Sequence, residues 1–175
     1  MEDFDYLGAG EVYLDSACQS LRPRAVIEAV NDYYTKHNSC GERVKYKWGV
    51  ETDEKVEAAR DAMLKYLKLP KRKYNTSFTL NTTYGINLIL SQLKPGAFRK
   101  VMTSEIEHNS PFLSTMALSK RLGIPREVMT REEDGSIDLD TYDFADAVVV
   151  VNCAANFDGR KLLNIKEVVK AVHKA

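Results

Sequence analysis

Neither sign of charge predominates in this sequence, and no long hydrophobic run is present. The 175 residues include 25 Lys and Arg and 25 Asp and Glu, so the formal net charge is zero. Nucleic-acid and membrane-surface proteins usually carry a basic footprint, which this balance argues against. The longest strongly apolar run, residues 147–151, is far shorter than the roughly 20 residues that span a bilayer. We therefore expect neither a nucleic-acid nor a membrane partner.

Cysteine is scarce, and its spacing predicts neither a disulfide framework nor a metal site. The three cysteines, Cys18, Cys40 and Cys153, are an odd number and lie far apart, without a C-x-x-C or H-x-x-x-H spacing. Reduced thiols in an intracellular protein explain this pattern better. The N-terminus is acidic and has no apolar segment of the secretory type. We expect a cytoplasmic protein with no metal.

The first 70 residues predict a short strand followed by helices. Residues 11–17 are strand-like, and a helix is expected within residues 20–37, with Pro23 in its first turn. Residues 38–49 are polar, aromatic and glycine-containing, which is typical of a loop. A second helix is expected over 51–69. Its apolar residues recur at helical spacing and predict a buried stripe, made of Val56, Ala59, Met63 and Leu67.

From residue 71 onward, strands and helices alternate. Strands are expected at 76–80, 100–106 and 147–152. Helices are expected from near Tyr84 to residue 93, and at 109–124 and 164–175. Ser110 is the expected N-cap of the 109–124 helix, with Pro111 at its first position. Alternation of this kind predicts an α/β domain with a mostly parallel sheet flanked by helices. The unbroken run 147–151 indicates a central strand covered on both faces. The helix that ends near residue 93 is expected to bury one side, made of Ile86, Ile89, Leu90 and Leu93.

Polar residues follow the predicted strands at the edge where parallel sheets bind ligands. They occupy residues 81–83, 104–110 and 152–159. Thr82 and Thr83 stand where a helix begins, so they could bind an anion, although capping the helix explains them better when they are taken alone. No G-x-G-x-x-G or G-x-x-x-x-G-K-[S/T] motif is present, which disfavours a dinucleotide or an ATP site.

His108 and Asn156 each have an ordinary explanation as well as a functional one. A single histidine is more often structural or exposed than ligand-binding, and Asn156 could be a turn residue before Gly159. Both nevertheless converge with Thr82 and Thr83 on one predicted edge. An anion site, a flat imidazole and an amide would together suit a planar, phosphorylated ligand.

Four stretches of the sequence resemble the N-terminal half of the class V aminotransferases, the pyridoxal-phosphate (PLP) enzymes that include cysteine desulfurases. These stretches follow the family's order and touch nearly the whole chain. They are YLDSACQSLRPRAVIEAVNDYY (13–34), FTLNTTYGINLIL (78–90), VMTSEIEHNSPFLS (101–114) and ANFDGRKLLNIKEVVKAVHK (155–174). The resemblance implies part of a fold-type-I large domain over 71–175, preceded by an N-terminal strand and helical segment over 1–70.

The resemblance also implies roles for individual residues. Thr82 and Thr83 match the turn that binds the cofactor phosphate, and His108 matches the histidine that stacks on the pyridine ring. Asn156 matches the asparagine near the ring hydroxyl and the substrate. Positions that match substrate loops are Ala17, Cys18 and Arg43.

Several family features have no counterpart in the 175 residues. The sequence stops before the aspartate that pairs with the pyridine nitrogen and the lysine that forms the Schiff base, so no catalytic residue is assigned. Residues 38–49 also lack the histidines of the desulfurase-type loop. We therefore expect part of a PLP enzyme that acts on an amino acid and binds PLP weakly, or only together with the missing half.

We expect either a homo-oligomer or a partner chain that carries the C-terminal half and supplies the missing groups, and this chain alone would be inactive. Two other functions remain open. The chain could be a non-catalytic module that binds an anion or PLP, or an interaction scaffold in which the site is vestigial.

Overall fold

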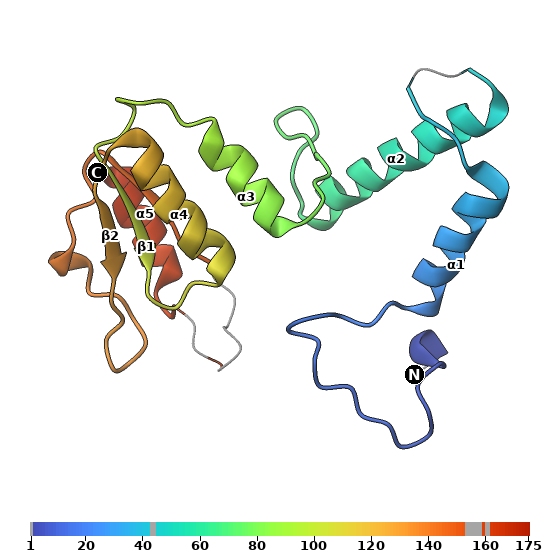
Figure 1. The fold of residues 1–175 in the computed structure, drawn as a ribbon, viewed down its shortest axis with the longest axis horizontal. Coiled ribbons are helices and arrows are strands. Elements are labelled where there is room, and N and C mark those ends of the chain that lie inside the picture. The colour runs from blue at the N-terminus through green and yellow to red at the C-terminus, as the bar shows by residue number, and fades with distance from the viewer. Residues whose placement is uncertain (1, 43–44, 153–158, 160–161) are drawn as a thin grey trace. The chain divides into compact units, whose positions relative to one another are not determined.

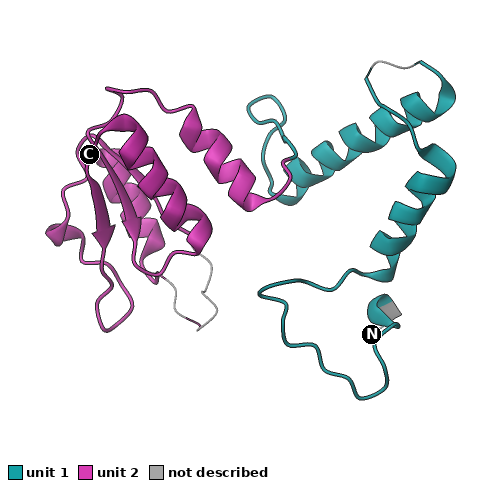
Figure 2. Cartoon of the chain, viewed as in Figure 1, with its two compact units in different colours: residues 1–78 teal, residues 79–175 magenta. Residues whose placement is uncertain are grey.

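The computed structural model describes residues 2–42, 45–152, 159 and 162–175 of the chain. Two compact units are present, residues 1–78 and residues 79–175 (Figure 2). Within the described residues, no helix is both long and apolar enough to cross a membrane.

Unit 1 is helical. Helix α1 starts directly after Pro23, whose φ of −55° lies within the range that its ring imposes. A π-helical turn continues α1, and a loop then leads to the longest helix of the chain, α2 (Figure 1). The elements of the unit are η1 (Glu2–Phe4), α1 (Arg24–Asp32), η2 (Tyr33–His37) and α2 (Lys47–Tyr66).

Three sequence predictions for unit 1 are wrong. Residues 11–17 form no strand, because no neighbouring segment pairs with them. Helix α2 begins at Lys47, inside the stretch that was predicted to be a loop.

The predicted stripe of α2 is open to solvent, since the exposed fractions of Val56, Met63 and Leu67 are 37%, 45% and 53%. Helical periodicity identifies an apolar face but cannot show whether anything covers it.

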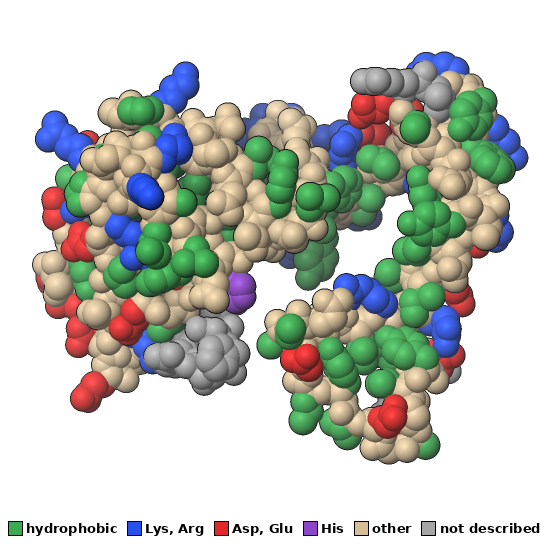
Figure 3. Space-filling view, in the orientation of Figure 1, with side chains coloured by type: hydrophobic (Ala, Val, Ile, Leu, Met, Phe, Trp, Pro, Cys, Tyr) green, Lys and Arg blue, Asp and Glu red, His purple; other side chains and the backbone are tan. Residues whose placement is uncertain are grey.

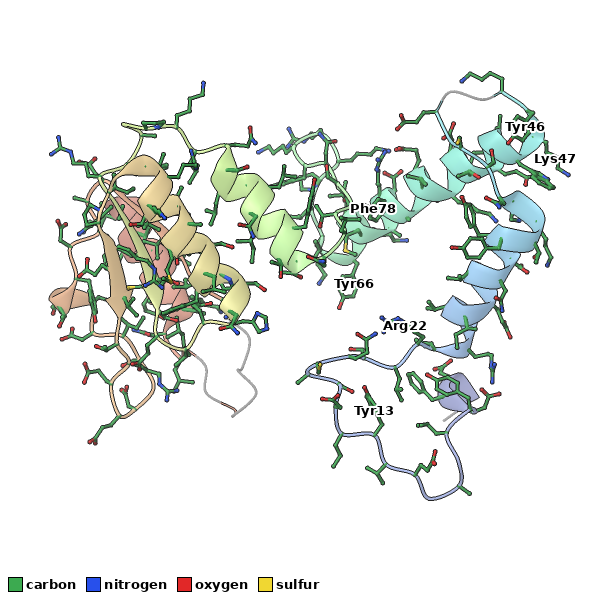
Figure 4. All side chains as sticks on the ribbon, viewed as in Figure 1. Tyr13, Arg22, Tyr46, Lys47, Tyr66 and Phe78 are labelled. Atoms are coloured by element: carbon green, nitrogen blue, oxygen red, sulfur yellow. The ribbon has the colours of Figure 1, made fainter. Side chains whose placement is uncertain are left out.

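Apolar and aromatic side chains are exposed throughout unit 1 (Figure 3). Tyr66 projects into solvent from the end of α2 (Figure 4), with 82% of the residue exposed. Phe78, near the end of the unit, lies 5.9 Å from the guanidinium carbon of Arg60 of α2. That distance allows a cation–π interaction between α2 and the segment that follows it.

Unit 2 is an α/β domain with a three-stranded parallel sheet. The strand order is β2-β1-β3, and Val101 of β1 lies opposite both Arg126 of β2 and Val148 of β3. Parallel neighbours of this kind require crossover connections. Helix α4 connects β1 to β2, whereas the connection from β2 to β3, residues 130–146, contains only the three-residue helix η3 (Figure 1). The elements are α3 (Thr82–Ser91), β1 (Lys100–Ser104), α4 (Asn109–Leu122), β2 (Arg126–Met129), η3 (Leu139–Thr141), β3 (Ala147–Val150) and α5 (Ile165–Lys174).

Helices cover both faces of the sheet. Val101 packs on one face against Leu90 of α3 and Leu118 of α4. The next residue, Met102, points to the opposite face and packs in a cluster with Val168 of α5. Because successive strand residues alternate between faces, the single strand β1 anchors two separate cores.

Four details of residues 76–175 differ from the sequence predictions. Residues 76–80 form no strand, and β3 is an edge strand of the described sheet, whereas 147–151 was predicted to be central. Ile89 of α3 was expected to be buried and is 67% exposed. A run of valines reveals a strand that avoids water, but its place in the sheet depends on segments distant in sequence.

The fourth difference concerns the start of α4. His108 is its N-cap and Asn109 its first residue, so Ser110 and Pro111 lie within the first turn.

Arg126 ties β2 to α4. Its guanidinium carbon lies 4.1 Å from the ring centroid of Phe112, and its Nε donates to the hydroxyl of Thr115 at 3.1 Å. Burial lowers the pKa of Arg126 below its usual range, because the charged form loses hydration. The stacked and hydrogen-bonded guanidinium fixes α4 over the β1–β2 pair.

The two cores predict a strong contrast between two methionine substitutions. Met102→Ala removes a fully buried side chain from β1, and we expect it to lower the free energy of unfolding by about 2–5 kcal/mol. Met116→Ala changes a side chain of α4 that is 48% exposed, and we expect less than about 1 kcal/mol. Urea unfolding followed by circular dichroism measures both; equal losses would contradict the described core.

Candidate functional site

The start of α3 is capped by Asn81, and this leaves the two threonines that follow free for other partners. The Asn81 side-chain oxygen accepts a hydrogen bond from the backbone N–H of Tyr84 at 2.8 Å, and the backbone carbonyl of Asn81 accepts from the N–H of Gly85 at 3.0 Å. The backbone N–H groups of Thr82 and Thr83 donate to no described residue. The capping role that the sequence offered to the threonines is thus filled by their neighbour.

A hydrogen-bonded chain links the start of α3 to the start of α4. The hydroxyl of Thr83 lies 2.6 Å from the hydroxyl of Ser110. The hydroxyl of Ser110 in turn lies 2.9 Å from Nδ1 of His108, and the backbone N–H of Ser110 donates to the same nitrogen at 3.1 Å. The imidazole therefore serves as the N-cap of α4, and its orientation is fixed by its own helix.

An open hollow of about 490 Å³ lies between these two helices. Its lining includes Thr83 and Asn87 from α3 and His108, Ser110 and Leu113 from the start of α4. Asn87 donates to the carbonyl of Thr83 at 2.9 Å, which holds the first turn of α3 in place. Both helices present their N-terminal ends near the hollow, and the partial positive charge of a helix N-terminus favours an anion there.

Beside the hollow, the buried carboxylate of Glu107 joins the carboxyl ends of β1 and β3. It accepts from the hydroxyl of Ser104 at 2.7 Å, and from the backbone and side-chain nitrogens of Asn152 at 3.1 and 2.6 Å. Only 7% of Glu107 is exposed. The residue before His108 thus anchors the segment that carries the imidazole.

The structure brings together some of the predicted site residues. Thr83 and His108 lie at one hollow, joined through Ser110, and Thr82 precedes Thr83 in the same first turn. Ala17 and Cys18 form an exposed turn of unit 1. Asn156 and Arg43 fall outside the described residues. Among the described residues, no three His, Cys, Asp or Glu side chains cluster as metal ligands would.

Sequence reasoning missed the roles of Ser110 and Glu107. Ser110 was expected to cap α4, and no role was predicted for Glu107. A signal did exist for Glu107, since an acidic residue at a strand end must find hydrogen-bond donors when the strand is buried. The contact between Ser110 and Thr83, which are 27 residues apart, could not be read from local pattern.

The donor set suits a planar ligand that carries a phosphate. Hydroxyls and free N–H groups at the start of α3 can donate to phosphate oxygens, which accept hydrogen bonds strongly. The exposed imidazole of His108 offers a flat face whose tilt is fixed by its Nδ1 contacts. These residues fit the phosphate end and one ring face of such a ligand.

Comparison with known proteins points in one direction. The profile described as Aminotransferase class-V matches residues 12–175. A probable cysteine desulfurase of Halalkalibacterium halodurans is 27% identical over 98% of this chain and 44% of its own length. The apo cysteine desulfurase of Thermococcus onnurineus NA1 aligns with a TM-score of 0.79 at 25% identity, covering 93% of this chain and 41% of that one.

A C-DES variant with glycine covalently linked to its PLP cofactor shares the fold. Its TM-score is 0.79 at 15% identity, over 99% of this chain and 45% of that one. The chain spans less than half the length of each of these relatives.

The Glu107 contacts predict a stability effect next to the hollow. Glu107→Ala would leave the buried hydroxyl of Ser104 and the half-buried nitrogens of Asn152 without their carboxylate acceptor, so we expect a loss of about 3 kcal/mol in the free energy of unfolding. Glu107→Gln keeps one acceptor oxygen and should cost less. Urea denaturation would measure both variants.

The matched control is Glu105→Ala, which removes an exposed carboxylate that accepts from the backbone of Arg131. We expect it to cost less than about 1 kcal/mol. If Glu107→Ala is no more destabilising than Glu105→Ala, the carboxylate does not anchor the strand ends.

Proposed function

Because the chain belongs to the class V aminotransferase family, we propose that it forms part of a PLP-dependent enzyme and holds the cofactor's phosphate and one face of its ring. The whole assembly would carry out aminotransferase or cysteine desulfurase-like chemistry on an amino acid. The Halalkalibacterium halodurans relative and the Thermococcus onnurineus structure described above, named as a probable cysteine desulfurase and a cysteine desulfurase, support the second of these chemistries.

One observation carries the proposal: the Thr83 hydroxyl and the His108 imidazole lie at a single hollow and are joined through Ser110. Thr82, Thr83 and the free N–H groups of α3 would bind the phosphate, since all of them can donate to its oxygens. When bound, PLP supplies the electron sink that labilises bonds of the amino acid.

His108 would orient the ring rather than move a proton. A backbone N–H can only donate, so Nδ1 must accept from Ser110, and the proton of the neutral ring lies on Nε2. The Nδ1 contacts are made at the ring edge, which leaves the faces of the imidazole available for stacking. An immobilised ring costs less entropy when a flat ligand binds against it.

We place the reactive lysine and the aspartate partner of the pyridine nitrogen outside these 175 residues. Exposed apolar residues of α3, such as Leu88 and Ile89, and the outer edge of β3 would then be covered by the segment or partner chain that supplies them. Parallel strands are normally buried on both sides, which supports such a cover. On this basis the chain alone binds PLP weakly and has no desulfurase activity.

A second candidate is a module that binds an anion or PLP without catalysis. The free N–H groups and hydroxyls at the start of α3 favour it, because a phosphate could bind there without any lysine. Inorganic phosphate separates the enzyme fragment from a module that recognises only the anion. A module that recognises only the anion should bind phosphate about as tightly as PLP, whereas an enzyme fragment should prefer PLP because it also contacts the ring.

Titration of the purified chain with PLP, followed by absorbance, tests the proposal. We expect weak, saturable binding that is weakened at least about tenfold in His108→Ala and in the Thr82→Ala/Thr83→Ala double variant, since each removes direct contacts. His173→Ala, an exposed histidine in the last turn of α5, is the matched control and should bind like the parent chain. Equal binding by all variants would place the ligand elsewhere.

Borohydride reduction of the PLP complex, followed by intact-mass and peptide analysis, tests the absence of a reactive lysine. We expect no stoichiometric adduct at any single lysine. One lysine modified to completion would overturn the assignment of the covalent link to another segment.

A further inference from the structure

We propose that Ser110 is a positioning residue that couples occupancy of the phosphate site to the hydrogen bonding of His108. The inference rests on the proposed function for the identity of the ligand. Ser110 would touch neither the ring nor the reacting atoms, and it would act through its two neighbours in the hydrogen-bonded chain.

Ser110 occupies the only described link between the two helix starts at the hollow. Its hydroxyl lies 2.6 Å from that of Thr83 and 2.9 Å from Nδ1 of His108. Its backbone is held in the first turn of α4, because its N–H donates to the same Nδ1 and its carbonyl accepts from the hydroxyl of Ser114 at 2.6 Å. The hydroxyl can therefore reorient its hydrogen while the backbone stays in place.

Counting hydrogens shows why the chain can transmit occupancy. Nδ1 of His108 accepts from the N–H of Ser110, so it brings no hydrogen of its own to the Ser110 hydroxyl. The hydroxyl hydrogens of Thr83 and Ser110 are then the only ones available for the Thr83–Ser110 and Ser110–Nδ1 contacts. In one arrangement Thr83 donates to Ser110 and Ser110 donates to Nδ1. In the other, Ser110 donates to Thr83, and the hydrogen of Thr83 is free for an external acceptor.

A phosphate at the start of α3 selects the second arrangement. Its oxygens accept hydrogen bonds, so they take the hydrogen of Thr83. Thr83 must then accept from Ser110, and the hydroxyl of Ser110 no longer donates to Nδ1. The imidazole keeps the backbone N–H and loses the hydroxyl bond, so binding of the phosphate changes the surroundings of the ring nitrogen. Ser110→Ala should uncouple the two events without removing the N-cap.

The first test needs no ligand. The ¹⁵N chemical shift of Nδ1 of His108 is measured in four proteins: the parent chain, Thr83→Val, Ser110→Ala and the double variant. We expect Thr83→Val to move this resonance when Ser110 is present, and to leave it unmoved in the Ser110→Ala background. A shift of the same size in both backgrounds would overturn the coupling. Thr83→Ser, which keeps the hydroxyl, should restore the parent shift and excludes a folding defect.

The second test adds inorganic phosphate to the parent chain and to Ser110→Ala. We expect phosphate to move the Nδ1 resonance in the parent chain and not in the variant, while phosphate affinity falls by only about 2- to 12-fold, as for the loss of one hydrogen bond. Ser91→Ala, at the other end of α3, is the matched control and should behave like the parent chain. A full Nδ1 response in Ser110→Ala would overturn the inference.

The two tests separate the inference from the proposed function. If the parent chain binds neither phosphate nor PLP, the proposed function is wrong, and the ligand-free cycle still decides whether Ser110 couples Thr83 to His108.

Discussion

The pairing of β1 on both of its edges determines where a site can form in this molecule. Val101, Met102, Thr103 and Ser104 are all buried, and the hydroxyl of Thr103 donates to the carbonyl of Val150 of β3 at 2.8 Å. A strand held in this way has one position and one direction. The positions of Glu107 and His108, just beyond the carboxyl end of β1, are fixed as well, because Glu107 is hydrogen-bonded to Ser104 of β1 and to Asn152 after β3.

The α/β class and the family could be predicted from the sequence, since alternating strand and helix patterns are local and the motif order is specific. The core strand β1 and the helices of unit 2 were found for the same reason. Residues 76–80 show the limit, because their pattern suits a strand and yet no partner in the described structure pairs with them. The stripe of α2 was wrongly predicted to be buried for the same reason. The sequence of a helix shows its apolar face, but whether that face is buried depends on another segment of the chain.

The site could be predicted only in part. Local sequence showed polar residues at the carboxyl ends of strands, and convergence of parallel strands implied that some of them would meet. Local sequence could not show whether the Ser110 side chain caps α4 or contacts α3, because a serine at this position suits both roles. That choice depended on Asn81 capping α3 and on His108 capping α4 through its ring, which requires the first turns of both helices to be placed.

The character of the hollow explains the share of the chemistry that we give to this chain. Among the described residues, its lining consists of hydroxyls, amides, one imidazole and apolar side chains, and no carboxylate or ammonium group lines it. Neutral donors held by helix starts are well suited to bind a phosphate and orient a ring, because their dipoles are fixed before the ligand arrives. A covalent amine and a strong base are different groups with different requirements for burial.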